Sequence, residues 1–235
     1  MSIFDNWAHS LRQLLFPITI CLACGQKING IGICPACSEK IRQAKRCPSC
    51  AAFLSEASDI CPLCCGNKKL PFTKAIAALP YEGILRRFLH NYKYHNQTWL
   101  ARPLSHILSI ALSDYDWTDF ILVPVPLSPT REKERGYNQS ELISSLVAKN
   151  LGLPCYKKAL KRDIDTPPLY SLNCQERYSL LTGAFSCGEQ SVAGKKILLI
   201  DDIFTTGATS IVCCNTLLRA EAVQIVVATI ASTKA

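Results

Sequence analysis

Eight cysteines near the start of the chain form four C-x-x-C pairs, and these carry the strongest chemical signal in the sequence. Two-residue spacing lets a tight turn present both sulfurs to one tetrahedral ion, and two such turns complete a Cys₄ zinc site. Gly25 follows the first pair and suits such a turn, because glycine tolerates a positive φ. The sequence therefore predicts two structural Zn²⁺ ions, bound by Cys21, Cys24, Cys34, Cys37, Cys47, Cys50, Cys61 and Cys64.

The spacing of the four turns leaves two ways to pair them. Sequential pairing joins the first turn with the second and the third with the fourth, and we favour it over a cross-braced arrangement. A set of buried or redox-active cysteines is the alternative to zinc, but it does not explain four evenly spaced pairs. Cys65 has no partner in either scheme. Nearby basic residues fit a nucleic-acid or protein contact and, equally, a solvated face: Lys40, Arg42, Lys45, Arg46, Lys68 and Lys69.

A second chemical signal is the string Ile197–Thr209, which reads ILLIDDIFTTGAT. An apolar run leads into two carboxylates, and small hydroxylated residues with a glycine follow where a helix begins. Parallel sheets bind ligands beyond the carboxyl ends of their strands. Free N–H groups and the helix dipole at such a point favour a phosphate. We expect it to be bound by Thr205, Thr206, Gly207, Ala208 and Thr209.

Asp201 and Asp202 directly precede this loop and would repel a phosphate unless another group lay between them. A sugar meets this condition, because its hydroxyls donate to the carboxylates while its 5-phosphate occupies the loop. The Walker and G-x-G-x-x-G patterns are both absent. The string resembles the phosphoribosyl pyrophosphate (PRPP) motif of type I phosphoribosyltransferases, and this resemblance gives the two aspartates the catalytic role. Helix capping alone would not account for the whole string.

The segment Val123–Glu141, VPVPLSPTREKERGYNQSE, follows another apolar strand. In the same resemblance, the loop after this strand contacts pyrophosphate, and Arg131, Lys133 and Arg135 are able to do so through charge-assisted hydrogen bonds. Read alone, R-E-K-E-R is more often an exposed, ion-paired segment. The residues that follow it, Gly136 to Gln139, favour the binding interpretation.

Alternating strands and helices must position these residues. Apolar runs predict strands at 74–80, 120–125, 197–202 and 223–230, and helical spacing predicts helices at 83–94, 99–113, 139–151 and 207–220. Nearly continuous apolar strands alternating with helices indicate a parallel sheet covered on both faces. We predict an α/β fold: a type I phosphoribosyltransferase-like domain at 71–235, a double zinc ribbon at 21–70 and a helical segment at 1–20.

Composition narrows the class of protein. The chain has 235 residues, of which 49% are hydrophobic and 19% charged, and this excludes wholesale disorder. No apolar run reaches the ~18 residues of a membrane-spanning helix, and the first twenty residues lack the basic start of a secretory signal. Fourteen cysteines without an export signal indicate a reducing compartment. The net charge of +8 fits an anionic ligand or nucleic acid.

Four ordered blocks are similar to the ComF family: the doubled cysteine ribbon, Lys93–Tyr94 with PVPLS…RGYNQS, T-P…L…E-R…G-A-F, and DDIFTTGAT. The resemblance implies a role in natural transformation, in which internalised single-stranded DNA is handled in the cytoplasm. It implies a competence helicase and DNA-processing proteins as partners. Contact with the inner face of the membrane is also expected, although a docking helix is the commoner explanation for the candidate residues Trp7, Leu14, Leu15 and Phe16.

The resemblance also implies a ligand set. PRPP would arrive with Mg²⁺, and its pyrophosphate would meet Lys93, Arg131, Arg135 and Arg177. The segment Thr166–Phe185 departs from many relatives, because Leu169 and Leu180 replace polar residues there. This puts in doubt the usual closure of that segment over a substrate base.

Three functions are compatible with these patterns. The favoured one is a DNA-handling competence factor whose pocket binds PRPP or a related sugar phosphate. The second is a metabolic phosphoribosyltransferase that uses PRPP and an unidentified base acceptor. The third is a zinc-ribbon adaptor with a vestigial pocket.

Overall fold

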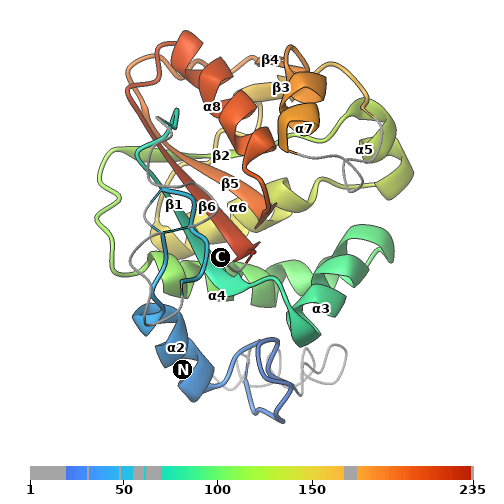
Figure 1. The fold of residues 1–235 in the computed structure, drawn as a ribbon, viewed down its shortest axis with the longest axis vertical. Helices are drawn as coiled ribbons and strands as arrows, with labels where there is room; N and C mark the ends of the chain where they lie inside the picture. Colours follow the sequence, from blue (N-terminus) through green and yellow to red (C-terminus); the bar gives the residue numbers. More distant parts are fainter. Residues whose placement is uncertain are drawn as a thin grey trace, which may run out of the picture.

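A four-stranded parallel sheet forms the centre of the molecule (Figure 1). In the computed structural model the strand order is β1-β6-β5-β2, and every neighbouring pair is parallel. Most residues of these strands are buried, which explains why the strands read as continuous apolar runs. The predicted parallel α/β fold is confirmed. The strands are β1 (Lys74–Pro80), β2 (Phe120–Pro124), β5 (Lys196–Phe204) and β6 (Gln224–Ser232).

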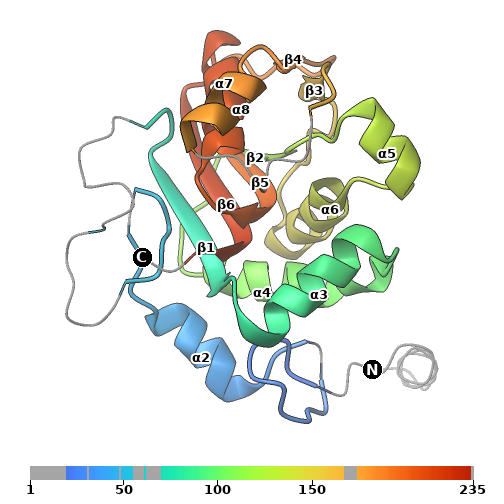
Figure 2. The ribbon, with the colours of Figure 1, turned by 45° about the vertical axis from the view of Figure 1, so that its right-hand side comes forward.

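Helices cover both faces of this sheet (Figure 2). Side chains of α4 and α6 share one core with alternate strand residues, and α3 adds to it. The helix α8 packs with the remaining strand residues on the opposite face. The boundaries lie close to those predicted, and α3 and α6 match them to the residue. The four helices are α3 (Gly83–Tyr94), α4 (Ala101–Leu112), α6 (Gln139–Leu151) and α8 (Ala208–Arg219).

Shorter elements surround the sheet. One of them, α5 (Pro129–Arg135), lies where the sequence suggested a loop after β2. Pro129 occupies its first turn and Gly136 ends it with φ 79°, so the two residues bracket a helix too short to show periodicity. The others are α2 (Pro35–Gln43), the 3₁₀ turn η1 (Thr98–Leu100), α7 (Cys174–Leu181) and an antiparallel pair, β3 (Leu160–Arg162) with β4 (Phe185–Cys187).

The cysteine-rich front end packs on both faces of the sheet around the edge strand β1. Leu22 and Ile41 are fully buried in the core that contains α4. Cys47, Cys50 and Cys61 belong to the core on the α8 face. The two cysteine groups therefore lie against opposite faces of the same sheet.

Arg46 joins these two groups to β1. Its guanidinium donates to the carbonyl of Ile41, at the end of α2, and to the carbonyl of Ala78 on β1 at 3.3 Å. Beyond it, the hydroxyl of Ser232 on β6 donates to the carbonyl of Ala51 at 2.9 Å. The front end is thus tied to the sheet by specific hydrogen bonds as well as by apolar packing.

The structure describes residues 20–30, 32–47, 49–54, 61, 70–166 and 174–233. Some predictions fall outside these residues: the helical segment before residue 20 with its membrane-contact candidates, and the positions of Cys64, Cys65 and Leu169. The side chain of Arg177, on α7, is also outside the description. The domain boundaries stay predictions.

Candidate functional site

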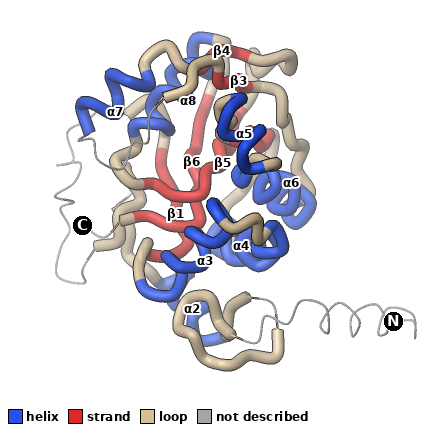
Figure 3. Tube along the Cα trace, turned by 90° about the vertical axis from the view of Figure 1, so that its right-hand side faces the viewer, coloured by secondary structure: helices blue, strands red, loops and turns tan. Residues whose placement is uncertain are grey.

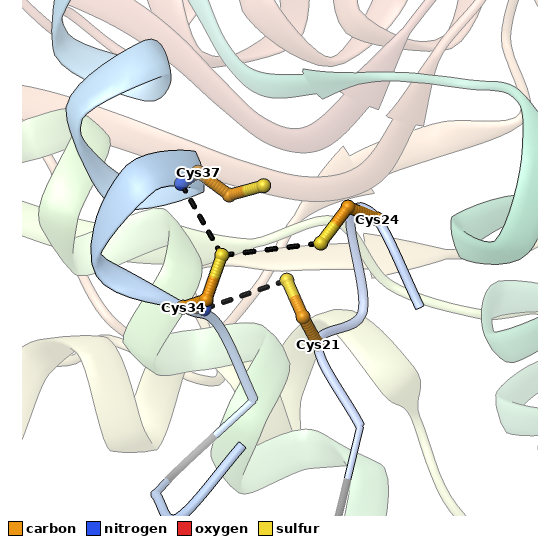
Figure 4. A group of neighbouring side chains, drawn as sticks. All are labelled: Cys21, Cys24, Cys34 and Cys37. Atoms are coloured by element: carbon orange, nitrogen blue, oxygen red, sulfur yellow. Dashed lines mark hydrogen bonds between the residues drawn. The ribbon is translucent and has the colours of Figure 1, made fainter. Parts of the chain in front are cut away.

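Four cysteine sulfurs converge between the first C-x-x-C turn and the start of α2 (Figure 4). The sulfurs of Cys21, Cys24, Cys34 and Cys37 all lie within 4.8 Å of one another. Tetrahedral zinc with bonds of about 2.3 Å places its ligand sulfurs about 3.8 Å apart. Cys24 Sγ lies 3.9 Å from Cys34 Sγ. This donor set fits zinc, and it pairs the first turn with the second, as the sequence favoured.

Backbone donors prepare this first cluster for thiolate chemistry. The N–H of Cys34 donates to Cys21 Sγ at 3.4 Å, and the N–H of Cys37 donates to Cys34 Sγ at 3.4 Å. Burial raises the pKa of Cys21, but backbone N–H groups, including those of Cys24 and Cys34, outweigh burial and lower this pKa to about 7. A thiolate, the form that binds metal, is therefore accessible at neutral pH.

A second cluster repeats the arrangement. The sulfurs of Cys47, Cys50 and Cys61 lie within 4.8 Å of one another, and Cys50 Sγ is 3.5 Å from Cys61 Sγ. The fourth predicted ligand, Cys64, lies outside the described residues. The three sulfurs that are described pair the third turn with the fourth turn's first cysteine, again in sequential order.

The two clusters use the same backbone turn. In the first, the N–H of Gly25 donates to the carbonyl of Cys21 at 2.8 Å. In the second, the N–H of Ala51 donates to the carbonyl of Cys47 at 2.9 Å. The φ angle is 79° at Gly25 and 57° at Ala51, so both turns need the left-handed region at the same position. The two cysteine modules, which resemble each other in sequence, therefore also share the same turn conformation.

The loop from β5 to α8 folds around a small hollow at the carboxyl end of a central strand. The hollow is lined by Asp201 and residues 203–210, which include all five predicted phosphate-binding residues. Gly207 precedes α8 with φ 76°, and a Cβ on it would lie 2.6 Å from Cζ of Phe204. Glycine is therefore required here for both its conformation and its size. A helix start with a closely approaching backbone suits an anion.

Lys93 brings a positive charge to the acidic pair. Its Nζ lies 2.9 Å from Asp202 Oδ2, and the two side chains are 23% and 10% exposed. Lys93 comes from the last turn of α3, which follows β1, whereas Asp202 comes from β5. Burial acts to lower the pKa of Lys93, but the charges of Asp202 and Asp201 outweigh it and raise this pKa. The site thus holds a firmly protonated amine beside a carboxylate.

Asp201 is held differently from its neighbour. Its Oδ1 accepts from Ser140 Oγ at 3.1 Å and from the N–H of Asp202 at 2.8 Å. Burial first, and the charge of Asp202 second, raise the pKa of Asp201 to about 7, while Lys93 and the two donors act against this rise. Asp201 is therefore able to hold a proton near neutral pH.

Asn138 fixes the start of α6 and, through it, Ser140. Its Oδ1 accepts from the N–H groups of Ser140 and Glu141 at 3.0 and 3.3 Å. Its Nδ2 donates to the carbonyl of Val125, just after β2, at 3.1 Å. From the sequence, Asn138 belonged to the segment that favours binding, but neither Asn138 nor Ser140 had a predicted role of its own. The available signal was an N-cap residue two positions before a serine and two positions after a helix-ending glycine.

Two tyrosines join α3 to α6. Tyr137 Oη donates to the carbonyl of Tyr92, and Tyr92 Oη donates to the carbonyl of Gln139 at 3.0 Å. Tyr92 is fully buried, and its neighbour in sequence is Lys93. The RGYNQS segment therefore positions both the lysine and the aspartate of the site.

The arginines of α5 point to different partners. The guanidinium of Arg135 lies 5.3 Å from the ring centroid of Tyr94, beside the Lys93 end of α3. Arg131 instead donates to the carbonyl of Thr166 at 3.1 Å. The structure thus brings Arg135 close to the residues around Lys93, and it places Arg131 against the start of the Thr166–Phe185 segment.

Arg162 is a buried residue for which the sequence predicted no role in the site. Its side chain contacts Thr166 Oγ1 and lies 5.3 Å from the ring centroid of Phe185. Burial first, and the charge of Arg131 second, lower the pKa of Arg162, while the charge of Asp201 acts in the opposite direction. Burial of a charged residue inside a K-R-D string has no signal in the sequence.

Comparison with known proteins gives consistent relatives. The chain is 31% identical over 155 residues to Competence protein F of Haemophilus influenzae, covering 62% of this chain and 68% of that protein. It is 29% identical over 168 residues to DNA utilization protein YhgH of Escherichia coli K12, covering 68% and 74%. It is 31% identical over 137 residues to Competence protein ComFC of Bacillus subtilis, covering 55% and 51%.

Family models, solved structures and the search for membrane spans complete the comparison. No family model matches the chain. A solved hypoxanthine phosphoribosyltransferase from Staphylococcus aureus aligns with 16% identity and a TM-score of 0.33, covering 60% of this chain and 69% of that one. Among the described residues, every helix is too short or too polar to cross a bilayer.

Proposed function

Because this chain belongs to the ComF family of competence proteins, we propose that it handles internalised single-stranded DNA and binds a phosphoribosyl ligand in its β5–α8 loop. The relatives are named competence or DNA utilization proteins. The proposed setting is the cytoplasm, at the inner face of the membrane. The proposed partners are a competence helicase and DNA-processing proteins.

One observation supports the ligand class above the others. Three features occur together at the carboxyl end of β5: a hollow at the start of α8, two adjacent carboxylates, and a largely buried lysine. The hollow suits the 5-phosphate, since its backbone is held open by Gly207. Asp201 and Asp202 suit the ring hydroxyls, which donate hydrogen bonds to carboxylates. A simple phosphate would be repelled by the acids, so a sugar phosphate is the better ligand.

The pyrophosphate of PRPP needs cations on the other side of the acid pair. Lys93 is already there, and Arg135 lies against the next residue of α3. Arg131 and Arg177 complete the proposed set. Asp201 and Asp202 would hold the Mg²⁺ brought with PRPP, since carboxylates offer the oxygen ligands that this ion prefers, and the ion would supply positive charge to balance the pyrophosphate. In this arrangement Lys93 exchanges its contact with Asp202 for one with the ligand.

Calorimetric titration of the purified chain with PRPP and Mg²⁺ tests the proposal. We expect saturable binding that Asp202→Asn and Asp201→Asn each weaken by about tenfold or more, since each loses a charge-assisted hydrogen bond. Asp119→Asn is the matched control, because Asp119 is an exposed aspartate at the opposite end of the sheet, ion-paired with Lys196. Ribose 5-phosphate should bind more weakly than PRPP.

Binding that is absent, or that the two aspartate variants leave unchanged, would contradict the pocket and favour an adaptor role. Release of pyrophosphate on addition of a defined base would instead favour a metabolic phosphoribosyltransferase. The titration and the pyrophosphate-release assay together separate the three functions that the sequence leaves open.

A further inference from the structure

The sequence has three basic clusters, at 86–87, 131–135 and 157–162, and the structure distinguishes them by their ion pairs. Lys157, Lys158 and Lys161 lie 3.1, 2.9 and 3.3 Å from carboxylates of Glu141, Glu189 and Asp163. This cluster is locally neutralised. In contrast, Arg86, Arg87 and Arg135 form no ion pair with any residue that the structure describes.

The two uncompensated arginines of α3 share one solvent face with aromatic residues. At about 100° per residue, Arg86, Arg87, His90, Lys93 and Tyr94 fall within an arc of about 120°. The buried residues Leu85, Leu89 and Tyr92 occupy the other side of the helix. No acidic residue occurs between Gly83 and Tyr94, so no residue within the helix opposes the charges of Arg86 and Arg87.

This face ends at the candidate phosphoribosyl site. Lys93 reaches into the site to Asp202, while Tyr94 remains 65% exposed. The ring of His90 lies 4.9 Å from the ring of Tyr94, and the guanidinium of Arg135 lies 5.3 Å from it. Figures 2 and 3 both place α3 and α5 on the same side of the sheet. We call Arg86, Arg87, His90, Tyr94 and Arg135 the α3 stripe.

Tyr94 is the aromatic residue of this region that can stack with a ligand. Tyr92 is fully buried and Tyr137 is half-buried, and their hydroxyls are engaged between α3 and α6. Trp99 packs against the core. Single-strand binding without sequence preference combines a positive surface with exposed aromatic rings on which bases stack. The α3 stripe has both features within about 12 Å of helix length.

We propose that the α3 stripe is the path of a single-stranded nucleic acid, with its phosphates on Arg86, Arg87 and Arg135 and a base stacked on Tyr94. The inference rests on the proposed role in DNA handling and gives that role a location. It leads the strand past the mouth of the phosphoribosyl pocket without placing it inside. A strand inside would set its 3′-phosphodiester against Asp201 and Asp202, which would repel it.

Binding of a fluorescent 20-nucleotide thymidine oligomer, measured by anisotropy from 50 to 300 mM salt, tests the path. Three phosphate contacts predict that log K falls with log salt at a slope of about −2. Arg86→Gln/Arg87→Gln should weaken binding at 50 mM salt by about tenfold or more and reduce the slope by about 1.4. The matched control Lys157→Gln/Lys158→Gln removes two charges that are already neutralised, and it should change both quantities far less.

Variants of Tyr94 test the contribution of base stacking to binding separately from that of charge. Tyr94→Ala should weaken binding by about fivefold or more with an unchanged salt slope, and Tyr94→Phe should restore it. All these side chains are exposed or half-buried, so the variants should melt like the parent protein.

Equal losses in the arginine variant and its lysine control would overturn the path, and so would a flat salt response of the parent protein. If the arginine variant lost binding to anionic phospholipid vesicles but kept binding to the oligomer, the α3 stripe would be a membrane-binding surface. That result would also overturn the proposed path. The calorimetric titration with PRPP is independent of these outcomes. A wrong path therefore leaves the pocket standing, and a wrong pocket leaves the path standing.

Discussion

Two neighbouring aspartates at the end of β5 differ in what holds them. Asp202 is paired with Lys93 from α3, whereas Asp201 accepts from Ser140 of α6. The two acids follow one another on β5 but meet different helices, although α3 and α6 pack in the same core. Asp202 keeps a compensating cation while Asp201 has only neutral donors, and the pKa of Asp201 rises to about 7 through burial and the charge of Asp202. A carboxyl group whose pKa is raised by burial and by a neighbouring charge is typical of functional sites.

The raised pKa of Asp201 predicts a pH dependence of stability. Its pKa is about 7 in the folded protein against 3.8 as the ordinary value, so the folded state binds a proton more tightly than the unfolded state. The contribution of this proton to stability is present below about pH 4 and is lost as the pH rises through about 7. Urea denaturation at pH 5 and pH 8 should show a larger loss for the parent protein than for Asp201→Asn. Asp119→Asn, the control, should lose as much stability between pH 5 and pH 8 as the parent protein. An equal loss in Asp201→Asn and the parent protein would contradict the raised pKa of Asp201.

Residues of the site differ in how visible they are in the sequence. The string from Asp201 to Thr209 could be recognised because a strand, a turn and a helix start place all its members together in the chain. Ser140 contacts Asp201 from 61 positions away, and no local pattern announces such a contact. Arg162 stands between the charged residues Lys161 and Asp163 in the sequence, yet the packing of β3 against β4 buries it. Long-range pairing, not residue type, decides these roles.

At the scale of elements, the start of α6 positions residues of the candidate site. Asn138 caps this helix with Oδ1 and holds the segment after β2 with Nδ2. Asn138→Ala should lower the free energy of unfolding by about 1–2 kcal/mol, because a cap and a buried hydrogen bond are both lost. Urea denaturation measures this. Asn150→Ala, at the exposed far end of α6, should change stability by less than about 0.5 kcal/mol.

The cap at the start of α6 should also affect PRPP affinity, which gives Asn138→Ala a second measurement. Ser140 follows the cap by two residues, so loosening of the cap should also weaken the hydrogen bond from Ser140 to Asp201. PRPP affinity of Asn138→Ala should then fall further than that of Asn150→Ala at a temperature where both proteins are folded. An equal affinity in the two variants would assign Asn138 to stability alone.

Long elements with strong periodicity were predictable, and short ones were not. The helix α3 matches its prediction because apolar residues recur with helical spacing over twelve positions. The helix α5 has seven residues, of which five are charged, and none of them is buried, so no apolar stripe marks it. β3 and β4 have three residues each, and their pairing is set by tertiary contacts. The order β1-β6-β5-β2 also depends on such contacts and could not be read from local patterns.

At the scale of the whole molecule, the cysteine front end is part of the packing that supports the site. A Cβ on Gly25 would lie 3.2 Å from Ile84 Cδ1, so the first turn packs directly against the start of α3. A Cβ on Gly32 would lie 2.5 Å from Cβ of Pro103, which shows an equally close approach to α4. The sequence indicated a ribbon but not this docking, because only the folded chain brings glycines of one segment against helices of another.

Removal of the first metal should therefore disturb the phosphoribosyl site at the other end of α3. Elemental analysis of the parent protein should return about two zinc ions per chain, and Cys21→Ser/Cys24→Ser should return about one, since two thiolates cannot complete a tetrahedral site. With its N-terminal support loosened, α3 should hold Lys93 less firmly beside Asp202, and PRPP affinity should fall together with the melting temperature. Cys187→Ser, which replaces an exposed cysteine outside both clusters, should preserve metal content and affinity. A one-zinc variant that binds PRPP as tightly as the parent protein would show that the front end and the pocket are independent, and it would refute this coupling.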